Sequence, residues 1–71
     1  MDELRKFAAR IKAVFQTGRA SQREMAEAFG VSQPTVFYWI NDAMMPSAKN
    51  IPAIRKALPK FERRKAKGAG Q

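Results

Sequence analysis

The side chains that could do chemistry in this chain are amides, hydroxyls, carboxylates and the cations of Lys and Arg, because the sequence holds neither histidine nor cysteine. Their absence excludes a disulfide scaffold, a thiolate or imidazole metal site, a cysteine nucleophile and histidine-dependent acid/base catalysis. Glu24 and Glu27 come closest to a catalytic carboxylate pair, but no supporting base accompanies them. We interpret them as a helix cap and a solvated helix face, and we expect no enzyme, no metal, no cofactor and no small-molecule ligand.

Positive charge is the chemistry that remains. The 71 residues include 14 Lys and Arg against 6 Asp and Glu, a net charge of +8, which favours a polyanionic partner, either nucleic acid or an anionic membrane surface. Residues 1–54 carry a net charge of +2 and residues 55–71 a net charge of +6. Residues 62–71 have no apolar side chain larger than alanine, so we expect a disordered basic tail that cannot insert into a membrane.

Length and hydropathy limit the architecture to one small domain, expected at residues 1–61. No apolar run approaches the roughly 18 residues of a membrane span. The start Met1-Asp2-Glu3 is acidic where a signal peptide is basic. We therefore expect a cytoplasmic protein.

Helical periodicity without the alternation of strands predicts an all-α fold. Helices are expected at about residues 2–17, 22–29, 33–42 and 51–58. The apolar stripe of the first helix consists of Leu4, Phe7, Ala8, Ile11, Val14 and Phe15.

Cap residues place the helix ends. Gly18 and Gly30 suit the left-handed position after the first and second helices. Ser21 and Glu24 have the spacing of a capping box at the start of the second. Pro59 is expected to end the fourth helix.

The spacing around Gly30 predicts a helix-turn-helix. Only Gly30, Val31 and Ser32 separate the second and third helices, and the small residue Ala26 stands where two such helices cross closely. The other inward positions of the unit are apolar: Met25, Phe29, Val31, Val36 and Trp39. In this geometry the second helix of the unit can enter the major groove of DNA.

Residues 21–41 read Ser-Gln-Arg-Glu-Met-Ala-Glu-Ala-Phe-Gly-Val-Ser-Gln-Pro-Thr-Val-Phe-Tyr-Trp-Ile-Asn, and residues 50–58 read Asn-Ile-Pro-Ala-Ile-Arg-Lys-Ala-Leu. These segments resemble the Cro/lambda-repressor-like (Xre-type) helix-turn-helix family. The resemblance implies a four- to five-helix lambda-repressor-like domain that binds double-stranded DNA. It also implies that Gln22 binds a phosphate and supports Gln33, which reads a base. The amide of Gln33 suits adenine, with which it can form a bidentate pair.

The other outward positions of the third helix offer apolar, hydroxyl and amide groups. We expect base contacts from Pro34, Phe37 and Tyr38, with Pro34 against a thymine methyl. Phe37 and Tyr38 could instead pack against the fourth helix or a partner subunit. Phosphate contacts are expected from Ser32, Thr35 and Asn41.

Two groups of cations are expected to bind phosphates. Arg19 and Arg23 stand at the entrance to the second helix, where the helix N-terminus favours anions. The tail is expected to add salt-dependent, sequence-independent affinity through Arg63, Arg64, Lys65 and Lys67, or else only to keep a small protein soluble.

Together these features predict a sequence-specific transcription regulator, a phage or prophage repressor of the Cro kind that acts in the bacterial cytoplasm or nucleoid. Such proteins bind two-fold half-sites. We expect a weak homodimer through the fourth helix, Met44-Met45 and Phe61, or a monomer that pairs on DNA. The alternative is a protein-interaction adaptor or antitoxin-like module that uses the Phe37 and Tyr38 surface.

Overall fold

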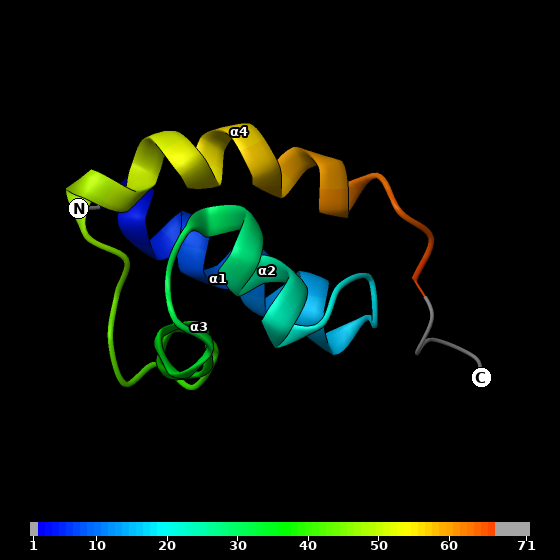
Figure 1. Ribbon diagram of the computed structural model, residues 1–71, viewed down its shortest axis with the longest axis horizontal. Helices are drawn as coiled ribbons and strands as arrows, with labels where there is room; N and C mark the ends of the chain where they lie inside the picture. The colour runs from blue at the N-terminus through cyan, green and yellow to red at the C-terminus, as the bar shows by residue number, and fades with distance from the viewer. Residues whose placement is uncertain (1, 67–71) are drawn as a thin grey trace.

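Four α-helices and one short 3₁₀ turn make up residues 2–66, the residues that this computed structural model describes (Figure 1). The elements are α1 (Asp2–Gln16), α2 (Gln22–Phe29), α3 (Gln33–Ile40), η1 (Ala48–Asn50) and α4 (Ile51–Glu62). Over this range the chain forms helices and connections without a strand, so the all-α prediction is confirmed.

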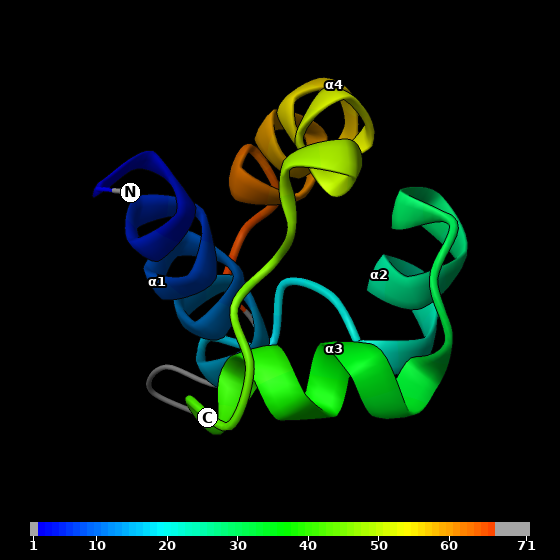
Figure 2. The ribbon, with the colours of Figure 1, turned by 90° about the vertical axis from the view of Figure 1, so that its left-hand side faces the viewer.

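One core unites the four helices. α1 and α2 each pack against both α3 and α4, and Figure 2 shows α3 and α4 at opposite edges of the bundle. The largest fully buried side chains come from every helix and include Ile11, Met25, Trp39, Ile54 and Leu58. Trp39 is 1% exposed, which confirms its prediction as a core residue.

The stripe predicted for α1 extends one residue too far. Val14 is buried, but Phe15 is exposed, because successive residues on a helix point about 100° apart. Phe15 therefore belongs to the outer side of the last turn of α1.

α1, α2 and α3 all end in a turn whose key residue is left-handed. Gly18 and Gly30 both have φ 71°, and Asp42 occupies the same position after α3 with φ 61°. The closing hydrogen bonds run from the N–H groups of Arg19, Val31 and Ala43 to the carbonyls of Val14, Ala26 and Tyr38, at 3.0, 3.0 and 2.9 Å. This is the Schellman arrangement. α3 consequently ends at Ile40 and not near residue 42, because Asp42 leaves the right-handed helical conformation.

α4 is longer than predicted. It continues through Pro59 to Glu62, so the prediction that Pro59 ends the helix was wrong. An internal proline costs about 3 kcal/mol because it removes one helical hydrogen bond. The extra turn, however, places Phe61 in the core at 6% exposed, with its ring edge-on to that of Phe29. Burial of such a side chain contributes about 1.5–3 kcal/mol, which offsets most of the cost.

The chain just after α4 is held against the loop between α1 and α2. Arg64 Nη1 donates to a carboxylate oxygen of Glu24 at 2.9 Å and to the carbonyl of Arg19 at 3.1 Å. Arg19 Nε donates in return to the carbonyl of Arg64 at 2.8 Å. The Arg64 guanidinium also lies over the Phe61 ring, 4.9 Å from its centroid. Residues 62–64 thus differ from the disordered tail expected to begin at 62, because specific contacts fix them.

Glu62 joins α4 to α1. Arg10 Nε and Nη2 donate to its two carboxylate oxygens at 2.8 and 2.6 Å. These hydrogen bonds hold the pKa of Glu62 below its ordinary value and raise the pKa of Arg10. Both side chains are a third or more exposed, so solvent screens the pair.

Glu62→Gln is expected to lower the free energy of unfolding at neutral pH by less than about 1 kcal/mol. A carboxyl group whose pKa is lowered by folding contributes stability above its unfolded pKa, and this contribution is lost as pH falls through the folded pKa. Thermal unfolding of the unmodified protein and of Glu62→Gln can be followed by circular dichroism at neutral pH and at about pH 2.5. The difference in Tm between the two proteins should be present at neutral pH and disappear in acid. A difference that is equally large in acid would contradict the assignment.

Candidate nucleic-acid interface

A capped helix and a tight turn fix the α2 to α3 unit. Ser21 Oγ accepts from the N–H of Glu24 at 3.1 Å, and the Glu24 carboxylate accepts from the N–H of Ser21 at 3.1 Å, which confirms the capping box. At Gly30 a Cβ would meet nothing within 4 Å, so its left-handed φ, and not crowding, is what favours glycine. Ala26 is buried, as the predicted helix crossing requires.

Hydrogen bonds within the protein hold both ends of α3. Ser32 Oγ accepts from the N–H of Thr35 at 3.4 Å and shares a hydrogen bond with Thr35 Oγ1 at 2.8 Å. Because one hydroxyl of this pair donates to the other, the pair keeps one O–H donor for a phosphate. At the other end, Asn41 Nδ2 donates to the carbonyl of Phe37 at 2.8 Å. The Asn41 amide therefore caps α3, and one N–H and its oxygen remain for an external partner.

α3 has an apolar inner face and a solvent-exposed outer face. Its buried residues are Val36, Trp39 and Ile40. On the outer side lie the four residues predicted to contact bases: Gln33, Pro34, Phe37 and Tyr38, all exposed. Figure 2 shows α3 running along the edge of the bundle, which leaves this side of the helix accessible to a partner.

A surface groove brings the two predicted glutamines together. It is lined by Gln22 of α2 and by Gln33, Pro34 and Phe37 of α3. Two amides and two apolar side chains thus share one shallow, open surface toward the start of α3. This combination suits the edge of an adenine next to the methyl group of a thymine.

Phe37 and Tyr38 lie against each other at the surface. Their ring centroids are 6.0 Å apart and their planes are inclined by 66°. They are 46% and 43% exposed. Neither belongs to the core, so both rings are accessible to a base or to a partner protein.

The two arginines near the start of α2 differ in accessibility. Arg23 is exposed and lies 3.6 Å from Glu27 in an ion pair across one helical turn. Arg19 uses Nη1 to donate to Thr17 Oγ1 at 2.6 Å, in addition to its bond to the Arg64 carbonyl. Arg23 is therefore the better placed phosphate ligand, while Arg19 holds the loop.

The cations after α4 also differ from one another. Arg63 and Lys65 are exposed, and neither has an ion pair with any residue that the structure describes. Arg64 is paired with Glu24. Lys67, the fourth cation predicted for the tail, lies outside the described residues.

The sequence did not reveal what fixes the far end of α3. Lys12 Nζ donates to the Asp42 carboxylate at 2.9 Å, which ties the turn after α3 to the middle of α1. The signal was weak, because an Asp that tolerates the left-handed conformation looks the same in a sequence as an Asp that merely follows a helix.

Residues 19–60 match the family model for helix-turn-helix proteins. This segment includes α2, α3 and most of α4. The chain belongs to the Cro/C1-type helix-turn-helix family. The resemblance noted in residues 21–41 and 50–58 is thereby confirmed, and membership makes the chain a DNA-binding transcription regulator.

Other comparisons add no relative. Neither the curated proteins nor the solved structures gave a significant match. In residues 2–66 no group of three or more side chains is arranged to hold a metal ion, and none of the described helices is long and apolar enough to cross a membrane.

The two faces of α3 predict effects of very different size on stability for two nearby aromatic residues. Phe37→Ala should change the free energy of unfolding by less than about 1 kcal/mol because the ring is about half exposed. Trp39→Ala should cost about 3–5 kcal/mol because it leaves a large cavity. Urea unfolding followed by circular dichroism measures both, and equal losses would show that the faces are assigned wrongly.

Proposed function

We propose that this chain is a sequence-specific regulator that reads the major groove of an operator with the outer face of α3. The observation that carries the proposal is the groove that joins Gln22 and Gln33 to Pro34 and Phe37. In helix-turn-helix proteins the first residues of the unit's second helix, here α3, contact base edges, while the unit's first helix, here α2, crosses the DNA backbone. Gln33 and Gln22 occupy these two positions.

The residues of α3 suggest which bases the operator contains. The helix reads Gln-Pro-Thr-Val-Phe-Tyr-Trp-Ile and has no charged side chain. It therefore lacks both the Arg that pairs with guanine and the carboxylate that accepts from cytosine. An amide for adenine and apolar groups for thymine methyls remain, so we propose half-sites rich in A·T pairs. Gln33 pairs with adenine, and Pro34 and Phe37 contact thymine methyls, with Tyr38 alongside.

Phosphate contacts surround this reading surface. Gln22 and Arg23 supply them at the start of α2, where the helix dipole favours an anion. The hydroxyls and amide at the ends of α3, and more weakly Arg19, add to them. Arg63, Lys65 and Lys67 raise affinity for any duplex. The candidate residues at the ends of α3 are Ser32, Thr35 and Asn41.

The biological role that fits this site is that of a Cro-like phage or prophage repressor in the bacterial cytoplasm or nucleoid. A repressor of this kind occludes an operator, and its two-fold half-sites favour dimeric binding. Met44 and Met45 are exposed and are the apolar side chains that we propose for a weak dimer contact. Phe61, which we expected to take part, is 6% exposed and packs edge-on against Phe29, so it offers such a dimer little contact area.

One observation supports a second candidate function. The half-exposed rings of Phe37 and Tyr38 would also suit a protein partner, as in an adaptor or antitoxin-like module. Selection from a random pool of duplexes separates the two functions, since an adaptor selects no consensus.

Gln33→Ala is expected to weaken binding to the selected duplex by about 1–3 kcal/mol and to leave non-specific binding unchanged, because it removes one bidentate base contact. Gln16→Ala, on the exposed side of α1, is the matched control and should change neither. Fluorescence anisotropy of the unmodified protein and of both variants, with the selected duplex and an unrelated one, measures the six affinities. If Gln33→Ala prefers the selected duplex over the unrelated one as strongly as the unmodified protein does, α3 does not read bases through Gln33.

Deoxyuridine in place of thymine tests the apolar part of the site, because it removes only the C5-methyl group. At the thymine that Phe37 contacts, the replacement should cost the unmodified protein about 0.8 kcal/mol, roughly a fourfold loss of affinity. Phe37→Ala should bind the two duplexes equally. If Phe37→Ala also loses about fourfold in affinity when deoxyuridine replaces thymine, the methyl group contacts a residue other than Phe37.

A further inference from the structure

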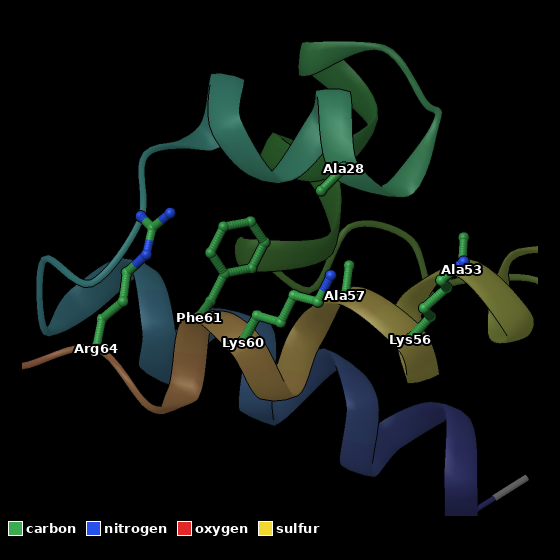
Figure 3. A pocket seen from close by; sticks show the side chains of 7 residues that line it. All are labelled: Ala28, Ala53, Lys56, Ala57, Lys60, Phe61 and Arg64. Atoms are coloured by element: carbon green, nitrogen blue, oxygen red, sulfur yellow. The ribbon is translucent and has the colours of Figure 1, made fainter.

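A second groove runs between α2 and α4, away from α3. Its volume is about 410 Å³. Figure 3 shows Ala57 and Phe61 pointing from α4 toward α2, and Ala28 pointing back from α2. Together with Ala53, one turn earlier on α4, these residues give the groove an apolar floor of small side chains that ends at the Phe61 ring.

A row of cations borders this floor. Lys56 and Lys60 lie one helical turn apart on α4, and Arg64 stands at the end of the groove (Figure 3). Arg64 is already paired with Glu24. Lys56 and Lys60 are exposed, and the structure gives neither of them an ion-pair partner among residues 2–66. The rim of the groove therefore carries two cations that are available to an acidic partner.

We propose that this groove binds an amphipathic, acidic helix of a partner protein. Alanines let a second helix approach closely and leave room for its bulky apolar side chains. Two lysines one turn apart are about 6 Å from each other along the helix axis, which matches two carboxylates at positions i and i+4 of an adjacent helix. The partner helix thus needs an apolar stripe beside an acidic stripe.

Other occupants fit the groove less well. The phosphate backbone of DNA would use the lysines but not the apolar floor. A second copy of this chain carries a net charge of +8 and would repel the rim. Figures 1 and 2 both show α4 and α3 on opposite sides of the bundle, so a helix in the groove leaves α3 free for DNA.

The probe for this proposal is a fluorescein-labelled helical peptide of about sixteen Ala, Leu and Glu residues, with its leucines on one stripe and its glutamates on the next. A peptide of the same composition with the order scrambled is the control. The striped peptide should bind at least about tenfold more tightly by fluorescence anisotropy. Backbone amide shifts of the ¹⁵N-labelled protein should change at Ala28 and along residues 53–61.

Two variants with the same change in charge locate the binding site. Ala28→Glu adds a carboxylate to the groove and should weaken binding of the striped peptide at least about tenfold. Ala9→Glu adds one on α1, where Ala9 is likewise exposed, and should weaken it less than about twofold. Circular dichroism confirms that both variants fold.

Replacing Lys56 and Lys60 together by alanine tests the rim in the same assay, with Arg5 and Lys6 of α1 replaced by alanine as the matched control. Only the first pair should cause a loss of about tenfold or more. Equal losses from the two pairs, equal binding of the two peptides, or competition by duplex DNA at the groove would overturn the proposal. A dimer that Ala28→Glu dissociates in sedimentation would assign the groove to a second copy and would also overturn it.

Discussion

The turn between α2 and α3 consists of Gly30, Val31 and Ser32. The conformation of this turn determines which side of α3 faces solvent. Gly30 is left-handed, and the N–H of Val31 bonds back to Ala26 at 3.0 Å. Trp39, on the inner side of α3, is buried in the core at 1% exposed. The turn and this buried side chain together fix the rotation of α3 about its own axis. The outer positions of α3 follow from that constraint, and so does the meeting of α2 and α3 side chains in one groove.

In this molecule the positively charged residues lie outside α3, the helix that we propose to read the DNA sequence. α3 carries no charged residue, and several cations that a simple count would assign to DNA are used within the fold. Arg10 holds Glu62, Lys12 holds Asp42 and Arg64 holds Glu24. Each pair contributes at most about 1 kcal/mol because it is exposed. Their larger effect is to fix where the helix ends lie, and the phosphate contacts that we propose come mainly from other cations, among them Arg23.

Local signals predicted most of the fold. The capping box at Ser21 and the glycine at position 30 predicted the bounds of α2, and the resemblance to the Cro/lambda-repressor-like family implied the roles of Gln22 and Gln33. What the sequence could not show was the effect of contacts distant in the chain. Pro59 lies inside α4 because the next turn contributes Phe61 to the core and Glu62 to Arg10. The reciprocal bonds of Arg19 and Arg64 join residues 45 positions apart, and no local pattern announces such a pair.

Nuclear magnetic resonance of the ¹⁵N-labelled chain tests the central claim most directly, since it can follow side-chain amides during titration with a duplex selected for binding. If the outer face of α3 reads the bases, the side-chain NH₂ signals of Gln33 and Gln22 shift together and saturate with the backbone signals of α3. Under the same conditions an unrelated duplex should move mainly backbone signals near Arg23 and after α4. Saturation by the selected duplex with the Gln33 signal unmoved would contradict the claim.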